Sequence, residues 1–433
     1  MLPVCLIKDT FVVKDNGSYV VYSPFSKKIT RINESPKEDS KIFCLLKGLG
    51  FFSDPPGAIL RDNIDSWSGF RSLTLLLTRR CNLRCIYCYA AAKDFGRTMD
   101  LNFAIETLNW FEKQLNGKAL RISFHGGGEP TLEIGLMQKI VLRACYLSEK
   151  SGKKTRFQIV TNGTFDISIA DWLIDNNFGI SISADGPSDI QDRNRPFADG
   201  SGSSKVVEKT ITYLVNKKHP FTVRLTFSPT DDTGRIVRYF GNLGVKSLHI
   251  EPLFPYGRDY DQIIFGSNSE QNVYSPSGKE LVESFLRAMD SVKEYGIKIT
   301  NSHLGHLAKW SGYFCGSACG RSMIVTDDQF ISGCLEVVDA QDPDFAAFRL
   351  GSFSNKQDSF VINKNVLARF QGRHSDTLSC CKKCFARYVC AGGCAVKAVR
   401  ASGSFMDKDI SYCEFTKALI PAVIKRIAHL SEV

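Results

Sequence analysis

The sequence predicts an α/β fold in which a parallel sheet curves into a partial barrel, with a small α+β module before it and a cysteine-rich region after it. Three observations predict this organisation. Six short β-rich runs alternate with longer helical patterns between residues 71 and 254, which is typical of a parallel sheet wrapped by helices. A hairpin-like pattern occupies residues 10–33, and most of the cysteines lie beyond residue 300.

The chain is 433 residues long and 43% hydrophobic, so it can build a buried core and is too long for one ordinary domain. We expect three segments, at 1–68, 69–298 and 299–433. No apolar run reaches the roughly eighteen residues that a membrane helix needs. MLPVCLIKDTF carries Asp9 too early for a signal peptide. We therefore expect a cytoplasmic protein without a membrane partner.

The cysteines and the charge narrow the classes of partner. Most of the fifteen cysteines cluster in two regions of a large chain, which indicates metal binding in a reducing compartment rather than a disulfide scaffold. The formal net charge of +10 favours an anionic partner, either nucleic acid or an acidic peptide. Nucleic acid is the weaker choice, because the chain has no long Lys/Arg run and no interleaved aromatic stripe.

The first segment predicts a small sheet followed by a helix. Residues 10–33 are predicted to form strands broken at Asn16-Gly17 and Ser23-Pro24, which are turn signals. A helical stretch, KEDSKIFCLLKGLGFF, follows at 37–52. Such a module could be a docking platform to which an extended peptide adds a strand. It could equally be a structural cap.

The middle segment supplies the barrel strands. They are SLTLLLT (72–78), LRISFHG (120–126), FQIVTNG (157–163), GISISADG (179–186), FTVRLTFSP (221–229) and SLHIEPLF (247–254). In the intervening segments 101–115 and 134–150, apolar residues recur at intervals of three or four residues, as they do in amphipathic helices. Six units are fewer than the eight of a closed barrel, so we expect an open, TIM-like (β/α)6 barrel. Residues 256–279, rich in Gly, Ser, Asn and Tyr, predict a mobile connection.

Three cysteines at Cys-x3-Cys-x2-Cys spacing, Cys81, Cys85 and Cys88, follow the first barrel strand directly. Chemistry in such barrels lies at the C-terminal ends of the strands. An iron–sulfur cluster usually takes four cysteine ligands, so three thiolates on one loop leave one iron open for a substrate or cosubstrate. A zinc knuckle completed by a distant residue is the alternative.

The region beyond residue 300 carries too many thiols for core packing to explain. The segment CKKCFARYVCAGGC (381–394) has Cys-x2-Cys-x5-Cys-x3-Cys spacing, and Gly392-Gly393 allows a tight fold around inorganic sulfur. A double zinc ribbon is the alternative here. Cys44 and Cys145 lie in apolar helical patterns and are predicted to be core residues. Cys5 has no assigned role, and Cys380 is a spare neighbour or an alternative ligand.

Between residues 70 and 415 the chain resembles the radical S-adenosylmethionine (radical SAM) superfamily, and its second cysteine region resembles the SPASM extension of the peptide-modifying members. Besides the cysteine triplet, the resemblance rests on FHGGGEPTLE (124–133), IVTNGT (159–164) and SADGPSDIQDRNRPF (183–197). The resemblance implies that SAM is bound by Tyr87, Gly127, Gly128, Glu129, Asn162, Ser183 and Arg195.

The resemblance also implies a role for several of these residues. Gly127 and Gly128 would let the backbone approach SAM, and Glu129 would receive the methionine ammonium. Asn162 and Ser183 would contact the ribose. The planar donor fork of Arg195 suits the carboxylate, with Arg193 as the neighbouring alternative.

For the SPASM region the resemblance implies two auxiliary [4Fe–4S] clusters, and thus three clusters in all. The first would be held by Cys315, Cys319, Cys334 and Cys394. The second would be held by Cys381, Cys384, Cys390 and Cys413. Many relatives have glycine at the position of Gln329, five residues before Cys334, so the local turn is in question.

The resemblance implies that an external electron donor, such as flavodoxin or ferredoxin, drives cleavage of SAM to a 5′-deoxyadenosyl radical. The expected substrate is a ribosomally made precursor peptide, bound through its leader by the N-terminal module. The expected reaction is oxidative crosslinking of its side chains. Carbon–carbon, ether and thioether bonds all fit, with a cyclophane-type link preferred. Glu336 or Asp185 could act as a base, and both could equally be structural.

Two alternatives remain. A sulfatase-maturing enzyme, which makes formylglycine, has a similar cluster arrangement but typically has aspartate immediately after the cysteine that corresponds to Cys334. This chain has Leu335 there. From a different class, the zinc-like spacings and the basic charge would also suit a zinc-dependent nucleic-acid-binding or scaffold protein.

Overall fold

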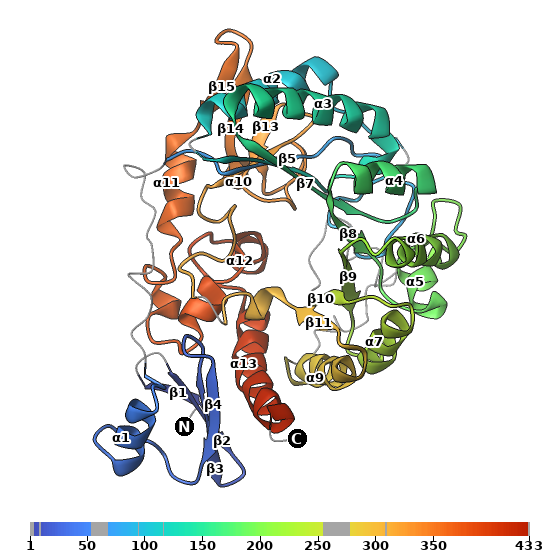
Figure 1. The fold of residues 1–433 in the computed structure, drawn as a ribbon. Coiled ribbons are helices and arrows are strands. Elements are labelled where there is room, and N and C mark those ends of the chain that lie inside the picture. Colours follow the sequence, from blue (N-terminus) through green and yellow to red (C-terminus); the bar gives the residue numbers. More distant parts are fainter. Residues whose placement is uncertain are drawn as a thin grey trace, which may run out of the picture.

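The computed structural model describes residues 4–7, 10–52, 68–93, 95–115, 117–253, 278–307 and 310–431. Within them, a four-stranded sheet comes first and an eleven-stranded sheet follows. The larger sheet curves around the middle of the molecule, with its helices on the outside (Figure 1). No described helix is long and apolar enough to cross a membrane.

All six predicted barrel strands are confirmed. They are β5 (Ser72–Leu75), β6 (Ala119–Phe124), β7 (Lys154–Thr161), β8 (Gly179–Ser183), β9 (Phe221–Phe227) and β10 (Ser247–Pro252). Each pairs in parallel with the next along the chain. β6, β7 and β8 end before the glycine- or asparagine-containing ends of their predicted runs, and the residues after these strands form loops of the site. Residue 254, the last of the sixth run, lies outside the described residues.

The sheet extends beyond the predicted six strands at both edges. β11 (Lys298–Thr300) pairs in parallel with β10, and β12 (Ser322–Val325) pairs in parallel with β5. β13 (Phe330–Ser332), β14 (Arg349–Ser354) and β15 (Ser359–Ile362) then continue it antiparallel. The middle and C-terminal segments thus share one sheet, and the boundaries at 69–298 and 299–433 stay a prediction. Residues 256–277 of the expected mobile connection lie outside the described residues.

The helices that cover the barrel are α2 (Leu101–Gln114), α3 (Ile134–Ser151), α4 (Ile167–Asp175), α5 (Ser188–Asn194), α6 (Ser204–Asn216), α7 (Thr233–Asn242) and α9 (Gly278–Tyr295). The helices predicted at 101–115 and 134–150 are confirmed. Asp100 caps α2 by accepting a hydrogen bond from the Phe103 N–H, as an N-cap side chain should. One stripe of each helix packs on the strands, so the outer faces are left to solvent.

Cys44 and Cys145 are exposed, so the prediction that they are core residues is wrong. In α1 (Lys41–Gly48) the buried side chains are Phe43 and Leu46, and in α3 the buried stripe runs through Met137, Ile140, Val141 and Ala144. A residue one position beyond a buried one turns about 100° around a helix axis. Both cysteines therefore follow a buried residue directly but lie on the outer face.

The N-terminal module is an antiparallel meander of β1 (Val4–Ile7), β2 (Thr10–Asp15), β3 (Ser18–Ser23) and β4 (Lys28–Ile32). The predicted turn at Asn16-Gly17 is confirmed, with φ of 44° and 83°, as a tight hairpin requires. One face of the sheet packs on α1 through Val12, Val21, Leu46 and Phe51. The other packs on the C-terminal helix α13 (Ile410–Ser431) through Val13, Val20, Ile420 and Ile424.

The C-terminal region also contains α10 (Phe345–Phe348), α11 (Lys364–Gly372) and α12 (Ala395–Ser402). α12 lies at the open side of the curved sheet, across from β9 and β10 (Figure 1). The main core runs without a break from barrel strands such as Leu75 and Phe124 to Phe348, Phe370 and Phe415. Barrel and cysteine-rich region therefore pack as one body around the site.

Candidate functional site

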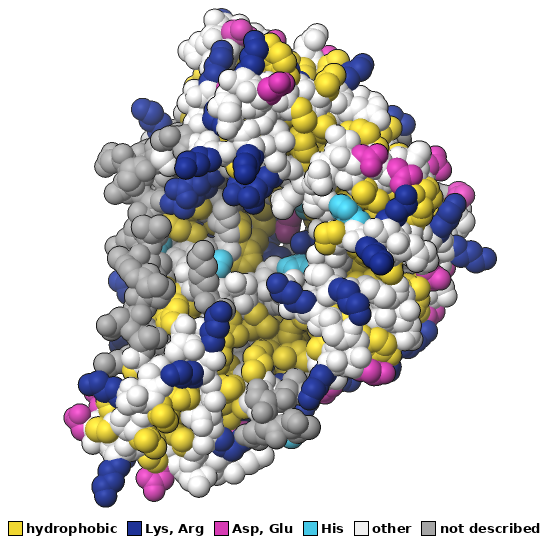
Figure 2. All heavy atoms as spheres, viewed as in Figure 1, with side chains coloured by type: hydrophobic (Ala, Val, Ile, Leu, Met, Phe, Trp, Pro, Cys, Tyr) yellow, Lys and Arg dark blue, Asp and Glu magenta, His cyan; other side chains and the backbone are white. Residues whose placement is uncertain are grey.

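The carboxyl ends of the barrel strands surround a cavity of about 330 Å³, large enough for a small ligand. Figure 2 shows this face hollowed at its centre, with basic side chains around the rim. The sequence-predicted residues that line the cavity are Cys81, Cys85, Tyr87, Cys88, Gly128, Glu129, Asn162, Ser183, Arg195 and Glu336. Gly127 and Asp185 are not among the lining residues.

The three-cysteine loop, residues 79–88, is fastened to the segment that follows α5. The Arg84 N–H donates to the Pro196 carbonyl at 2.7 Å, and the Ile86 N–H donates to the Asn194 carbonyl at 2.9 Å. Leu83 is buried and forms an isolated bridge with Phe197. Backbone contacts with the end of α5 and with the residues after it thus fix a loop that has no regular structure of its own.

Gly127 and Gly128 admit the backbone of this loop. The Glu129 N–H donates to the Arg80 carbonyl at 2.8 Å, and a Cβ on Gly128 would lie 2.0 Å from that same oxygen. Gly127 has a φ of 81°, and a Cβ there would lie 3.0 Å from the Thr78 carbonyl oxygen. Both glycines therefore admit the protein's own backbone at Thr78 and Arg80. The approach to SAM that was predicted for them stays a prediction.

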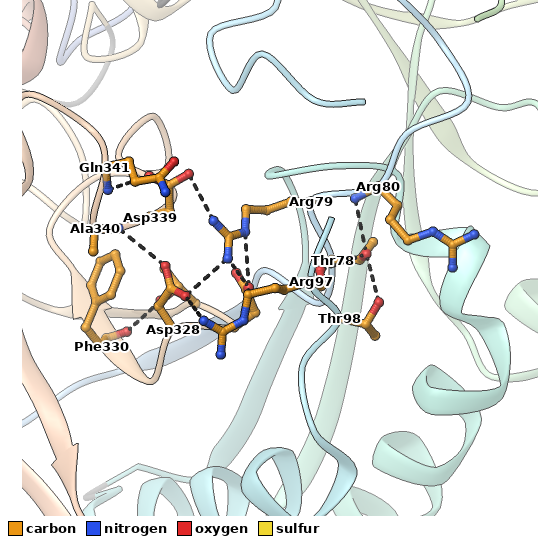
Figure 3. Close-up of polar contacts among 12 residues, drawn as sticks. Thr78, Arg79, Arg80, Arg97, Thr98, Asp328, Phe330, Asp339, Ala340 and Gln341 are labelled. Carbon is orange, nitrogen blue, oxygen red and sulfur yellow. Dashed lines mark hydrogen bonds and ion pairs between the residues drawn. The ribbon is translucent and has the colours of Figure 1, made fainter. Parts of the chain in front are cut away.

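An ion-pair cluster ties the start of the loop to the C-terminal region (Figure 3). Arg79 Nη2 lies 2.6 Å from Asp327 Oδ2 and 3.1 Å from Asp328 Oδ1, and its Nη1 lies 3.2 Å from Asp339 Oδ2. Arg97 adds a 2.9 Å pair with Asp328. Asp327 and Asp339 are almost fully buried, so Arg79 compensates charges that would otherwise be costly to bury.

The thiols of the loop fit a metal cluster. Burial raises the pKa of Cys81 and Cys85 to about 12, so both would stay protonated at neutral pH unless a cation compensated the thiolate. Within the described ranges, no three His, Cys, Asp or Glu side chains converge tightly enough to hold a single metal ion. A zinc site needs that convergence, whereas cubane thiolates bind different irons. The donor set therefore fits a [4Fe–4S] cluster better than zinc.

Glu129 is an oriented carboxylate on the cavity wall. Its Oε1 accepts hydrogen bonds from the Thr131 hydroxyl at 2.6 Å and the Thr161 hydroxyl at 2.7 Å, and its Oε2 accepts from the Asn162 N–H at 2.7 Å. Burial raises the pKa of Glu129, and these hydrogen bonds oppose the shift. The Asn162 side chain donates to Asn82 at 2.8 Å, which connects β7 to the cysteine loop.

Arg195 lies between the cysteine loop and Asp185. Its Nε is 3.1 Å from Asp185 Oδ2 and its Nη2 is 3.1 Å from Oδ1, while its guanidinium lies 5.2 Å from the Tyr87 ring centroid. The Tyr87 hydroxyl also donates to Asp185. Arg193, the alternative in register, is about half exposed and pairs with Asp231 at 2.9 Å. Of the two arginines, Arg195 is the one that lines the cavity.

The two candidate bases, Asp185 and Glu336, differ in whether their carboxylates border the cavity. Asp185 is fully buried and also accepts from the Thr226 N–H at 3.1 Å and from Asn194 Nδ2 at 3.2 Å, so its oxygens are used within the protein. Glu336 lines the cavity and pairs with Arg400 at 2.7 Å. Only Glu336 of this pair borders the cavity.

The C-terminal cysteines form two groups of neighbours. Burial raises the pKa of Cys334, and the nearby Cys394 and Cys315 add to the shift, with Cys319 acting in the same way on Cys315. Burial raises the pKa of Cys390 to about 12, with Cys413 and Cys384 as the next contributors. Burial also raises the pKa of Cys381, and the nearby Cys380, Cys390 and Cys384 add to the shift. This grouping agrees with the two predicted ligand sets, whose ligation stays a prediction.

Gln329 and Cys380 are two further residues of this region whose roles the sequence left in question. Gln329 adopts a φ of 63° in the β12–β13 turn, the left-handed conformation that favours glycine. This chain thus keeps the turn with a residue that is strained in it. Cys380 Sγ lies 3.8 Å from Cys381 Sγ, as expected of a spare neighbour or an alternative ligand.

The sequence analysis missed six titratable residues that line the cavity: Tyr89, His125, Arg224, His249, Glu251 and Lys397. A signal for some of them exists. Strands buried on both faces of a parallel sheet usually form continuous apolar runs, yet in β9 the residues Thr222, Arg224 and Thr226 alternate with buried hydrophobic ones. That alternation indicates a polar barrel interior.

Comparison with known proteins agrees with this geometry. Residues 75–240 match the model of the radical SAM superfamily. An uncharacterised protein of Methanocaldococcus jannaschii, MJ0907, is 32% identical over 196 residues, which are 44% of this chain and 66% of that protein. A cysteine-type anaerobic sulfatase-maturating enzyme of Clostridium perfringens is 25% identical over 377 residues, 81% of this chain and 95% of the relative.

Two solved structures share the fold. A structure described as native anSMEcpe with bound AdoMet and Cp18Cys peptide has a TM-score of 0.65 at 21% identity, covering 84% of this chain and 99% of its own. Streptococcus suis SuiB bound to S-adenosylmethionine has a TM-score of 0.57 at 12% identity, covering 94% of this chain and 99% of its own. The cofactors of the matched domain are a [4Fe–4S] cluster and SAM. Residues 75–240 therefore form a radical SAM domain, and a cysteine-rich region lies on its C-terminal side.

Proposed function

We propose that this enzyme modifies a ribosomally made precursor peptide by oxidative crosslinking of its side chains. The observation that carries the proposal is the composition of the cavity. One wall holds the three-cysteine loop, Glu129 and Arg195, and the other holds Glu336 and Lys397 from the cysteine-rich region. A substrate in this cavity would lie between the residues expected to bind SAM and those expected to hold an auxiliary cluster.

On the SAM side, each residue has a specific task. Cys81, Cys85 and Cys88 would hold the cluster, and Glu129, locked by its hydrogen bonds, would orient the methionine ammonium. Arg195 would meet the carboxylate with the donors that Asp185 leaves free. The bound cluster and SAM would supply a 5′-deoxyadenosyl radical, which abstracts a hydrogen atom from the peptide.

On the substrate side, the chemistry requires an electron acceptor and a base. Closing a bond between two side chains removes two hydrogen atoms in total. One goes to the 5′-deoxyadenosyl radical, and the other leaves as an electron and a proton. The two groups of C-terminal cysteines are the residues that would hold the electron acceptors. Glu336 is the better placed of the two candidate bases, because it borders the cavity.

Two observations favour crosslinking over formylglycine formation. The position after Cys334 is Leu335, which packs with Leu76, Ile324 and Val338 in an apolar cluster, where sulfatase-maturing enzymes typically have aspartate. In addition, the SuiB structures cover 94–95% of this chain and one of them is described as bound to a precursor peptide, SuiA. The anSMEcpe structure covers only 84%.

The N-terminal sheet supports leader binding. Its two faces are covered by α1 and by α13, while its edge strands β1 and β4 each pair on one side only among the described strands. An extended leader could add a strand at either edge. Deleting residues 1–65 should lower the affinity for the leader at least tenfold, with iron content as the control for folding. Unchanged affinity would refute the docking role.

The catalytic assignment is tested by anaerobic reconstitution with iron and sulfide. Three cubanes require about twelve irons per chain. Changing Cys81, Cys85 and Cys88 together to Ala should leave about eight irons and abolish formation of 5′-deoxyadenosine from SAM. If SAM is still cleaved, or if the protein holds only zinc after reconstitution, the proposal fails.

The substrate is tested with a peptide encoded in a neighbouring open reading frame. Co-expression followed by mass spectrometry should show the loss of two hydrogen masses per crosslink, and only with the intact cysteine loop. An unchanged peptide mass would count against crosslinking.

Sulfatase maturation is the second candidate, favoured by the 25% identity that spans 95% of the Clostridium perfringens enzyme. A sulfatase-derived peptide with a reactive cysteine separates the two. Conversion of that cysteine to formylglycine, with no crosslink in the neighbouring peptide, would assign this function instead.

A further inference from the structure

Three polar side chains line the cavity without a hydrogen-bond or ion-pair partner among the described residues. Tyr89 follows the cysteine loop, His125 follows β6 and Arg224 lies on β9, and all three line the cavity. Within the described part of the chain, no hydrogen bond or ion pair joins any of these side chains to another residue, and the buried Nδ1 of His125 is unsatisfied. Buried polar atoms are normally paired, which His125 Nδ1 is not, and the half-buried Tyr89 and Arg224 side chains line the same cavity. Together they offer donors to a ligand.

Arg224 is the cation of the group. The other arginine in the cavity, Arg195, is held by both oxygens of Asp185. Burial lowers the pKa of Arg224, and the negative charge of Glu251 opposes that shift without reaching it as an ion pair. Its five donors remain available for a planar, two-oxygen acceptor.

The carboxylates of the cavity are all engaged elsewhere. Glu129 accepts from Thr131, Thr161 and Asn162. Glu251 lies 2.8 Å from His249 Nε2 and accepts from the Ser302 N–H at 2.6 Å. Glu336 pairs with Arg400. Among the described lining residues, no carboxylate is therefore left over for Arg224, and an anionic ligand can take that place.

His125 and Tyr89 can complete an anion site. Burial, helped by the charge of Arg224, lowers the pKa of His125 to about 4, so the neutral imidazole has one N–H to donate at neutral pH. The Tyr89 hydroxyl occupies space that Gly126 leaves open, since a Cβ there would lie 2.6 Å from it.

We propose that Arg224, with Tyr89 and His125, binds a carboxylate of the peptide substrate next to the residue that is modified. This inference rests on the proposed action on a peptide. The expected SAM contacts follow β5 to β8, whereas Arg224 lies on the next strand, β9. Tyr89 is within electrostatic range of Glu336 and Cys334 of the cysteine-rich region. The Arg224 site thus lies on the substrate side of the cavity.

A second cavity supports this placement. Arg224 and His125 also line a space of about 620 Å³ that runs along the inner faces of β7 to β9 and reaches Leu335. The two side chains therefore stand where the two cavities meet. A peptide segment entering the barrel interior would pass them, and an acidic side chain on it would find Arg224 desolvated and unpaired, which favours a charge-assisted pair.

The test uses the reconstituted full-length enzyme and two capped, fluorescent hexapeptides that are identical except for one Asp or Asn. Fluorescence anisotropy should show that the wild type prefers the Asp peptide by on the order of tenfold. Arg224→Gln should abolish the preference, Arg224→Lys should keep part of it, and Tyr89→Phe should weaken it. Arg121→Gln, an exposed arginine on β6, is the matched control and should keep the full preference.

Three results would overturn the proposal. The first is a wild type without preference, including one that binds neither peptide. The second is a preference that survives Arg224→Gln in protein with normal iron content. The third is weaker binding of SAM, but not of 5′-methylthioadenosine, in Arg224→Gln with the peptide preference intact, since the carboxylate would then be that of SAM. Because no turnover is needed, an Arg224-dependent preference in an enzyme that forms formylglycine would retain this site and refute crosslinking.

Discussion

The two cysteine regions of this enzyme differ in how the protein holds them and in the charge that it buries beside them. The three-cysteine loop is one continuous segment, held by the end of α5 and by the loop after β6. The buried Arg195 beside Cys85 is neutralised by Asp185. The C-terminal cysteines come from separate segments. The buried Arg373 beside them donates only to the carbonyls of Phe405, Asp407 and Gly392 among the described residues.

This difference suits two electronic tasks. A cluster that must reduce SAM needs a low potential, and a positive charge beside it would raise that potential. Pairing Arg195 with Asp185 removes most of that effect. A cluster that accepts an electron is helped by a positive charge, and Arg373 is within electrostatic range of Cys394 from one group and of Cys381 and Cys390 from the other. We therefore expect the environments of the two regions to push the potentials apart.

Gly128→Ala should have the largest effect, and only on the loop. The new Cβ would lie 2.0 Å from the Arg80 carbonyl oxygen, so the loop could not dock. We expect SAM cleavage to fall by on the order of a hundredfold or more and iron content to fall from about twelve to about eight. Gly135→Ala is the matched control, because nothing lies within 4 Å of its Cβ. Full iron content in Gly128→Ala would contradict this role.

Arg79→Gln should weaken the contact between the three-cysteine loop and the C-terminal region. It would leave Asp327 and Asp339 buried without their main partner, which typically costs about 3–5 kcal/mol. Thermal unfolding under anaerobic conditions measures the loss. Arg97→Gln is the comparison, because Arg97 is 68% exposed and exposed pairs contribute about 1 kcal/mol or less. If both changes lowered the unfolding midpoint equally, the Arg79 ion pairs would contribute no more to stability than an exposed pair.

Arg373→Gln should lower the reduction potentials of the auxiliary clusters proposed for the C-terminal cysteines by on the order of 100 mV, from the Coulomb energy of one charge at an intermediate dielectric. A redox titration followed by electron paramagnetic resonance measures the shift. Arg373→Lys keeps the charge and should restore most of the potential. Arg349→Gln, on an exposed site, should change nothing. If only the reduction potential of the cluster on the three-cysteine loop shifted, Arg373 would act on that cluster and not on those of the C-terminal cysteines.

Gln329→Gly should have the smallest effect and should stabilise the C-terminal region. Relief of the left-handed conformation at φ of 63° is worth about 0.5–1 kcal/mol, measurable as a higher unfolding midpoint. Lys356→Gly, in the exposed β14–β15 turn, should lower the midpoint slightly, because it only adds backbone entropy to the unfolded state. A lower midpoint in Gln329→Gly would show that the Gln329 side chain contributes contacts that outweigh the strain.

Local patterns predicted much of the fold. The six strands, the helices at 101–115 and 134–150 and the Asn16-Gly17 turn depend on periodicity and turn chemistry over short stretches, and all are confirmed. The short strands β11 to β15 were missed, because three to six residues carry too little period to stand out. Cys44 and Cys145 were misassigned because an apolar neighbourhood in sequence does not specify a face of a helix.

The sequence by itself determined the cysteine spacing, the order of the motifs and thereby the superfamily, since these are properties of short contiguous segments. Only the tertiary structure decided that Gly128 admits Arg80, that Asp185 neutralises Arg195, and that Arg373 and Arg224 lack a carboxylate among the described residues. The physical reason is that compensation of a buried charge depends on what lies within a few ångströms of it. Those neighbours come from segments that are far apart along the chain.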